Sequence, residues 1–545
     1  MKWIVVIAVI ITLYGYFHYI FDPFNRFTST FVERIYNFVG YPNAYANFIL
    51  AVIPIPFYFL YKDVKPSVRR ALYVSLILII SAFFLTYSRG AFIALSVISI
   101  PYILGILFSS KGHLKQGIKK LKTIVLLVVL SAILTIPVNY LRSMNNSEVA
   151  SFADKITLES GEKDTSTSDR LEFWEGSIEM FMDNPVFGTG PGSFQYVFPA
   201  YQKTLLANSN SPHNLFLKLL VENGVFAMAF FVLFMLILFL RGIMVYKNFT
   251  KNERLLIFTL AASIIGSLLH NMVDYNLNFV SIILLLFIFF GVIGFIINKN
   301  SDKFVTELKV RFVKYLLVLV GLLMCFVALH EVYYSYVFIQ ARAAHKAGDY
   351  TAAESYYTKA KDIFLKRDLF IGFAQMNVKK FETEGDIKYL ENAEKLLLTG
   401  FSLNSHDAFI VNYLGDIAFD MNKIEQAKNY YAQSLKLDPK NNLDYYYDNL
   451  NVDDALTKEE IDDLIALLDD YHDKLAQNAH LTILTGNPDS AVMIYELLLS
   501  KIKDTEFAFV YNDKLLEGLK QMQDTYELEK SKFEKHYNLK LTKED

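Results

Sequence analysis

Apolar residues in this chain are gathered into blocks of roughly 20, the length that an α-helix needs to cross a bilayer. Polar segments that contain most of the charges separate these blocks. Nine membrane spans are expected near residues 3–21, 44–61, 71–87, 91–108, 123–140, 219–240, 255–273, 277–297 and 315–337. The pattern therefore predicts an all-α protein built around a polytopic membrane bundle, with its first apolar block retained as a span.

Basic residues alternate between the connecting segments. Lysine and arginine cluster within residues 62–70, 111–122, 241–254 and 299–314. Loops rich in these residues stay in the cytoplasm, so the N-terminus is expected there as well. The intervening segments are then expected on the outer face, and they comprise residues 22–43, 88–90, 141–218 and 271–276.

The pattern changes after the last expected span, to helical periodicity with alternating charges and few glycines. Small and large residues stand at the positions that a tetratricopeptide repeat requires, namely Leu414, Gly415, Ala427, Tyr431, Ser434 and Pro439. Weaker copies surround Tyr357, Leu397 and Tyr495. We therefore expect two domains, a membrane domain at 1–337 and an extracytoplasmic helical solenoid at 338–545.

The loop 141–218 is longer than most connections between helices, and loops of that length are usually functional. Its segment 169–183 reads as a short amphipathic helix at the membrane interface, anchored by Phe173 and Trp174.

Composition narrows the chemistry. Hydrophobic residues make up 53% of the chain, which is too apolar for a soluble protein of this size, and the formal net charge of −3 favours no nucleic-acid partner. The single cysteine, Cys325, excludes an intrachain disulfide and a cysteine-based metal site. No metal-binding or nucleotide-binding motif occurs, and GTGPGSF at 188–194 has the wrong spacing for a phosphate loop. We expect neither a metal nor a cofactor.

Arg89 stands between two apolar runs with almost no loop around it. A cation at that depth is costly, so its side chain either anchors a helix end to lipid phosphates or binds an anion at the membrane boundary. Arg170 begins the amphipathic helix, where it either pairs with a neighbouring carboxylate or binds an anion as well. Two arginines on one face could bind phosphate groups bidentately.

His213 and Asn214 follow Pro212, just before a long apolar helix. The histidine is either an ordinary interfacial residue or a proton acceptor near neutral pH. The turn HNMVDYNLNF adds His270 and Asp274 to the same expected face, where Asp274 either orients an arginine or caps the next span.

Four stretches in this order resemble the bacterial O-antigen ligase and polymerase-like membrane glycosyltransferases. They are GYPNAYANFIL, TYSRGAFIAL, SDRLEFWEGSIEMFMDNPVFGTGPGSF and SPHNLFLKLLVENG, and with the spans between and after them the resemblance covers about residues 36–297. Members with a C-terminal tetratricopeptide region are familiar. Several spans usually precede the Pro-Asn pair in the family, but only one precedes Pro42 here, so the chain is either a shortened variant or lacks its start.

The resemblance implies transfer of a glycan from a polyprenyl-diphosphate carrier to a glycan, lipid or protein acceptor on the outer face of the cytoplasmic membrane. It assigns His213 as the catalytic residue that activates the acceptor hydroxyl, and Arg89 and Arg170 as diphosphate-binding residues. Asn214 and Asp274 complete the expected substrate-binding set.

Two other functions compete with transfer. A non-catalytic membrane scaffold would use the solenoid to recruit cell-envelope proteins, with its arginines contacting lipid headgroups only. A transporter would require paired, interrupted helices at the membrane midplane, and no such pair is evident in the sequence.

Overall fold

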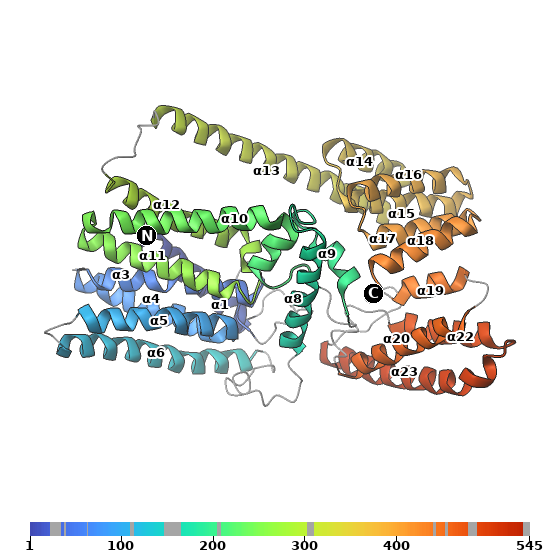
Figure 1. Ribbon diagram of the computed structural model, residues 1–545, viewed down its shortest axis with the longest axis horizontal. Coiled ribbons are helices and arrows are strands. Elements are labelled where there is room, and N and C mark those ends of the chain that lie inside the picture. The colour runs from blue at the N-terminus through green and yellow to red at the C-terminus, as the bar shows by residue number, and fades with distance from the viewer. Residues whose placement is uncertain are drawn as a thin grey trace. The chain divides into compact units, whose positions relative to one another are not determined.

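The computed structural model describes residues 1–21, 34–36, 40–62, 64–109, 114–145, 165–203, 209–301, 310–439, 443–452, 456–477 and 488–537. Every regular element within these ranges is a helix, which confirms the predicted all-α class (Figure 1). The chain divides into two compact units. The first comprises Met1–Pro191 and Ser211–Val305, and the second comprises Gly192–Asn210 and Thr306–Asp545.

The first unit is a helical bundle in which most helices are apolar. It contains α1 (Lys2–Phe21), α2 (Pro42–Val52), α3 (Pro54–Leu60), α4 (Pro66–Leu85), α5 (Arg89–Ser109), α6 (Leu114–Ser143), α8 (Thr165–Asp183), α10 (Leu215–Met244), α11 (Lys251–His270) and α12 (Val280–Lys299). The helices α2, α3 and α4 each begin with proline, whose fixed backbone angle suits a first turn. Thr250 and Glu253 form a capping box that begins α11.

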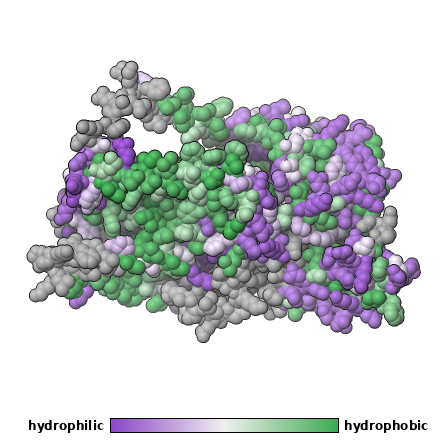
Figure 2. Space-filling model, in the orientation of Figure 1, coloured by the Kyte–Doolittle hydropathy of each residue, from purple (hydrophilic) through white to green (hydrophobic). Residues whose placement is uncertain are grey.

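Eight helices in the described part of the chain are long and apolar enough to cross a membrane. Because a bilayer offers no water to the backbone, such segments satisfy their own hydrogen bonds as helices. The chain is thus a multi-pass membrane protein. The fourth expected span, 91–108, lies within α5, and Arg89–Pro101 is the apolar part of this helix among the residues whose side chains are described. Hydrophobic side chains cover much of the visible face of the first unit (Figure 2).

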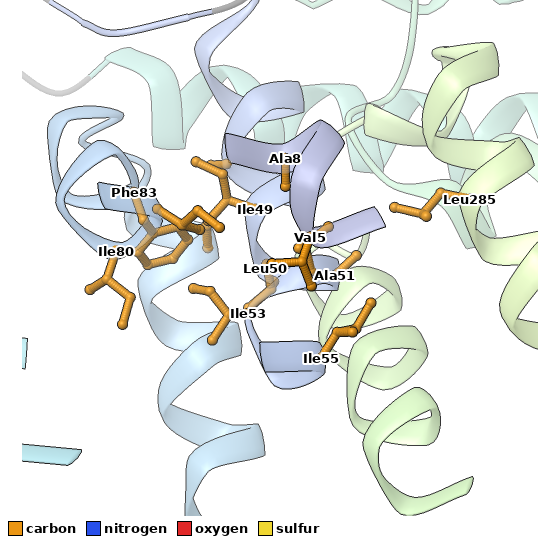
Figure 3. Packing of buried hydrophobic residues seen from close by; sticks show 14 of the residues in the cluster. Val5, Ala8, Ile49, Leu50, Ala51, Ile53, Ile55, Ile80, Phe83 and Leu285 are labelled. Carbon is orange, nitrogen blue, oxygen red and sulfur yellow. The ribbon is translucent and has the colours of Figure 1, made fainter. Parts of the chain in front are cut away.

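The core of the first unit surrounds α2. This helix and α3 form the most buried of the eight candidate spans, because 78% of their apolar stretch is buried inside the protein. Figure 3 shows Ile49 and Leu50 of α2 packed among side chains from α1 and α4. Ile53 precedes Pro54 at the junction of α2 and α3, where proline interrupts the helical hydrogen bonds. This core fixes the ends of α2, α4 and α11, which carry the site described below.

The second unit is a helical solenoid. It comprises α13 (Val310–Lys346), α14 (Tyr350–Ile363), α15 (Arg367–Glu384), α16 (Lys388–Leu403), α17 (Ala408–Asp420), α18 (Ile424–Leu437), α19 (Leu443–Val452), α20 (Lys458–Gln477), α22 (Pro488–Ile502) and α23 (Ala508–Tyr537), together with α9 (Phe194–Val197) and the 3-10 turn η1 (Phe198–Tyr201). Figure 2 colours its surface largely hydrophilic. The expected domain limit at 337 falls inside α13 and stays a prediction.

Helix pairs of the solenoid pack as the repeat pattern requires. A Cβ atom added to Gly415 of α17 would lie 2.4 Å from the Tyr431 ring of α18, so the two helices cross closely only because position 415 has no side chain. Tyr357 and Ala360 are fully buried in the α13–α14–α15 cluster, and Leu397 is fully buried in the next one. The weaker sequence copies therefore also occupy buried positions between helices.

Candidate functional site

A small cavity of about 90 Å³ lies in the first unit, where segments far apart in the sequence meet. Three of the predicted substrate-binding residues, Arg89, Arg170 and Asp274, line it. The other lining residues are Arg34, Asn43, Tyr87, Ser88, Gly90, His270 and Val273. The cavity therefore combines several cationic side chains with one carboxylate in a partly buried space.

Arg89 and Gly90 are the first two residues of α5, so this helix starts at the cavity wall. The first N–H groups of a helix lack intrahelical partners and carry a partial positive charge, which adds to the guanidinium in attracting an anion. Tyr87 just before them has φ of 47°, a left-handed conformation that few residues other than glycine adopt. Backbone angles of this kind are common at functional sites, where the surrounding structure holds a residue in an unfavourable conformation.

Arg170 reaches the cavity from α8. Its Nε atom is buried and has no hydrogen-bond partner within the described ranges. The same helix carries Phe173 and Trp174, which were expected to anchor it at the membrane interface. The Phe173 ring is buried in the protein and stacks on His213 with ring centres 5.7 Å apart. Trp174 is half-buried, its Nε1 donates a hydrogen bond to the Pro212 carbonyl, and its role as a membrane anchor stays a prediction. Both rings make these contacts because α8 packs against α10.

His213 lies beside the cavity through its contact with Asp274. Its Nδ1 atom is 3.5 Å from Asp274 Oδ1, and its side chain is 19% exposed, so one edge of the ring remains accessible. The ring also meets Tyr275 edge-on, with centres 4.6 Å apart. His213 has φ of 50°, so it is the second strained residue near this site.

Asp274 is almost completely buried. Its Oδ1 atom accepts hydrogen bonds from the Tyr41 hydroxyl at 3.1 Å and from the Tyr275 backbone N–H at 2.8 Å. Burial by itself would raise the pKa of Asp274, but the contact with His213 and nearby positive charges, including Arg170, hold that pKa below its usual value. The carboxylate is therefore ionised at neutral pH and oriented toward the imidazole.

Asn214 has a clear structural role as the N-cap of α10. Its side-chain oxygen accepts hydrogen bonds from the backbone N–H groups of Phe216 and Leu217, at 2.9 and 3.2 Å. The backbone N–H of Leu215 donates to the Asn271 carbonyl at 2.8 Å, which ties the start of α10 to the turn after α11. These contacts hold His213 in place, and substrate binding by Asn214 stays a prediction.

Comparison with known families fits this geometry. Residues 74–232 match the O-antigen ligase family, and residues 408–441 match the tetratricopeptide repeat. The chain contains an O-antigen ligase domain. Its matched region includes Arg89, Arg170 and His213, whereas Asp274 lies beyond its end. A search of curated proteins finds no match.

The cavity of about 90 Å³, called the ligase-domain cavity from here on, is also lined by residues that the sequence did not single out. Arg34 lies in the segment between α1 and α2, where nothing in the pattern distinguishes it from a solvated charge. Asn43 was noted only as part of the Pro-Asn pair in the family resemblance. His270, which the sequence placed on the same face, is fully buried and bonds through its ring nitrogens to Asn47 and Ser88, each at 3.2 Å.

A glycine-containing loop beside the ligase-domain site braces a break in α10. Gly224 has φ of 74° and interrupts the helix, and a Cβ atom there would lie 2.1 Å from a backbone carbonyl oxygen of the loop. The backbone N–H groups of Thr189 and Gly190 donate to the carbonyls of Val221 and Glu222 at 2.8 and 2.9 Å. The first two turns of α10, which follow His213, are thus fixed independently of the long apolar part.

The solenoid contains a separate and larger cavity of about 910 Å³. Aromatic and basic side chains line much of it, including Phe338, Arg342, Lys346, Tyr350 and Lys379. Residues 338–545 as a whole hold 37 acidic and 25 basic residues. The cavity is therefore a basic surface within an acidic domain.

Proposed function

We propose that this chain is a membrane glycosyltransferase that moves a glycan from a polyprenyl-diphosphate carrier to an acceptor hydroxyl, as a ligase or polymerase of a surface polysaccharide. The O-antigen ligase match supports a role in surface polysaccharide assembly. The observation that carries the finer proposal is the convergence of Arg89 and Arg170 on one cavity with Asp274, which also holds His213.

The diphosphate of the donor is the group that this cavity suits. Guanidinium groups bind phosphate oxygens through paired, charge-assisted hydrogen bonds. The buried Nε of Arg170 and the N-terminus of α5 beside Arg89 both offer donors to such an anion. Because negative charge on the diphosphate grows as it leaves, these donors stabilise the transition state more than the bound donor substrate.

His213 is proposed to act as the general base. Asp274 faces Nδ1, so a proton on Nδ1 is stabilised and Nε2 keeps its lone pair. The acceptor oxygen then attacks the anomeric carbon of the donor sugar while its proton passes to Nε2. The bond between that carbon and the diphosphate oxygen breaks, and the polyprenyl diphosphate leaves with the electron pair.

The proposed reaction takes place on the outer face of a bacterial cytoplasmic membrane. The basic loops at 62–70, 111–122, 241–254 and 299–314 support a cytoplasmic location for the opposite ends of the helices. The cavity residues then belong to segments on the outer side, and no soluble nucleotide is required there because the lipid carrier supplies the activated sugar.

Recruitment of a cell-envelope protein is a second proposed function, and the solenoid cavity favours it. Arg342, Lys346 and Lys379 place several cations beside aromatic rings in a concave surface, which suits an extended acidic segment of a partner. If the chain is also an enzyme, recruitment by the solenoid would bring an acceptor or a partner protein to it. If recruitment is the only function, the chain is the non-catalytic membrane scaffold.

Substitution at the ligase-domain site separates catalysis from scaffolding. We expect His213→Ala to lower glycan transfer by at least about 100-fold, because a general base contributes roughly 100-fold to 10,000-fold to such a step. Arg89→Ala should cause a loss of similar size. Both variants should still insert into the membrane at normal levels. The measurement is surface glycan in cells together with transfer by the purified chain from the lipid-linked glycan that accumulates when the gene is deleted.

Exposed basic residues away from the cavity provide the control. Arg70→Ala removes a positive charge from the exposed start of α4 and should leave transfer unchanged. Normal surface glycan in both His213→Ala and Arg89→Ala cells would refute the enzyme and favour the scaffold. The lengths of the product glycans then distinguish joining of finished chains from stepwise polymerisation.

A further inference from the structure

A third arginine extends into the ligase-domain cavity from outside the matched region. The Nε–H of Arg34 donates to the Thr86 carbonyl at 2.6 Å, in the turn just before Arg89, and its Nη2 group donates to Asn43 Oδ1. The Ile35 backbone N–H donates to the Leu85 carbonyl at 3.0 Å. Both the side chain and the backbone of this segment are thus anchored at the cavity wall.

Burial, together with the nearby charges of Arg170 and Arg89, lowers the pKa of Arg34 to about 10, although Tyr41 and Asp274 act in the opposite direction. Arg34 is therefore still positively charged at neutral pH, but the protein holds that charge at a cost. A second negative group in the cavity would reduce the cost. A buried cation that lines a cavity together with two further arginines is a candidate binding group for an anion.

Charge balance points to the kind of anion. Among the described residues that line the cavity, Arg34, Arg89 and Arg170 contribute three positive charges and Asp274 contributes one negative charge, a formal sum of +2 without His270. A diphosphate esterified at both ends carries one negative charge on each phosphorus near neutral pH. With Arg34 included, the cavity and such a diphosphate neutralise each other.

The contacts of Arg34 continue to the proposed catalytic base. Asn43 accepts from Arg34 and donates through Nδ2 to the Tyr41 hydroxyl at 3.0 Å. The Tyr41 hydroxyl in turn donates to Asp274 Oδ1 at 3.1 Å, and this oxygen lies 3.5 Å from His213 Nδ1. A continuous row of hydrogen bonds therefore connects the arginine to the carboxylate that orients the imidazole.

We propose that Arg34 is a third diphosphate-binding residue, and that the row through Asn43 and Tyr41 couples donor binding to the orientation of Asp274 and His213. This inference rests on the proposed function. The diphosphate holds the Arg34 guanidinium in place, which keeps Asn43 and Tyr41 in their observed orientations. The same row keeps Asp274 directed at His213 while the donor occupies the cavity.

Two substitutions test the two parts of the proposal separately. Arg34→Gln removes a charge from the cavity and should raise the donor KM by at least about tenfold, since a charge-assisted hydrogen bond is lost. Tyr41→Phe keeps all three guanidinium groups and interrupts the row. It should lower kcat by about tenfold with little change in donor KM, because it affects the base and not the anion.

Binding without turnover provides a second measurement. Inorganic pyrophosphate should raise the thermal unfolding temperature of the purified full chain in detergent. That increase should be lost in Arg34→Gln, partly retained in Arg34→Lys and unchanged in Tyr41→Phe. The matched controls are Arg70→Gln, an exposed charge on α4, and Tyr58→Phe, a buried phenol of α3 that does not line the cavity. Both controls should behave as the wild type does.

The outcomes separate this inference from the proposed function. If the wild type transfers glycan, His213→Ala does not, and Arg34→Gln keeps both kcat and KM, then Arg34 has no role in donor binding and only this inference fails. If Tyr41→Phe keeps the wild-type kcat, the coupling is refuted. The donor KM of Arg34→Gln then decides by itself whether Arg34 binds the anion. If the wild type itself transfers no glycan, the proposed function fails.

Discussion

The role of each residue at this site depends on the residues that it contacts. Arg89 alone could anchor a helix end to lipid, and His213 alone could be an interfacial histidine. In the structure, Arg89 shares a cavity with Arg170 and Asp274, and Asp274 contacts His213. A histidine oriented by a buried carboxylate can accept a proton at one defined nitrogen, which an isolated surface histidine cannot do as efficiently.

Gly90 is a position at which a single added Cβ atom should affect activity. An added Cβ would lie 2.7 Å from Val273 Cγ2, so Gly90→Ala pushes the start of α5 away from the turn that carries Asp274. We expect Gly90→Ala to lower glycan transfer by about tenfold, since small misplacements of catalytic groups have large effects on rate. Combining it with Val273→Ala makes room for the new methyl group and should restore most of the activity.

The control for this experiment is Gly291→Ala in α12, where a Cβ would meet no atom within 4 Å. It should leave transfer unchanged. Equal losses in Gly90→Ala and in the double variant would mean that the glycine is needed for a reason other than its contact with Val273.

At the scale of elements, breaks and crossings position the side chains. The interruption at Gly224 separates the start of α10, which follows His213, from its long apolar part. The starts of α2 and α5 and the turn after α11 all contribute residues to one cavity. In the solenoid, the close crossing of α17 and α18 buries carboxylates as well as apolar side chains.

Asp416 lies at that crossing and accepts a hydrogen bond from the Tyr431 hydroxyl at 2.9 Å. Burial, together with the carboxylates of Asp448, Asp420 and Asp444, raises the pKa of Asp416 to about 7. Its folded-state pKa thus exceeds its unfolded value, so the stability linked to its proton is fully present below about pH 4 and is lost as the pH rises through about 7.

We therefore expect Asp416→Asn to weaken the pH dependence of solenoid stability. In the wild type, amide hydrogen exchange in α17 and α18, corrected for the intrinsic rate, should show less protection at pH 8 than at pH 5. The variant should show a smaller difference. Asp386→Asn is the matched control, because the contact with Lys388 holds the pKa of Asp386 below its usual value and outside this window. An unchanged difference in Asp416→Asn would contradict the assignment.

At the scale of the whole molecule, the location of each segment relative to the membrane decides the function. The basic loops predict that Lys247 faces the cytoplasm and that the solenoid lies on the opposite side. The chain has one cysteine, Cys325, which lies within the apolar helix α13. A single replacement of this residue therefore gives a cysteine-free background for labelling.

Labelling of intact cells with a membrane-impermeant maleimide tests this topology. On a Cys325→Ser background, Lys395→Cys in the exposed face of α16 should react, because the solenoid is expected outside the cytoplasmic membrane. Lys247→Cys should react only after the membrane is permeabilised. Labelling at position 247 in intact cells, with protection at position 395, would place the cavity in the cytoplasm and end the proposed reaction.

The sequence by itself determined the helices and their order. Apolar blocks of span length and the spacing of Gly415, Ala427 and Tyr431 depend on local periodicity, which a single sequence records directly. It also supplied Arg89, Arg170 and His213 as candidates, because Arg89 stands between two apolar runs and the family resemblance assigned roles to all three.

Only the tertiary structure decided which of these residues meet. Arg34, Tyr41 and Asn43 reach Asp274 through packing of α2 between distant helices, and no local pattern encodes such contacts. The contact of the Phe173 ring with His213 and the hydrogen bond of Trp174 to Pro212 depend on tertiary packing in the same way. Local spacing fixes a helix and its faces, whereas the site depends on the burial of charges that many segments must compensate together.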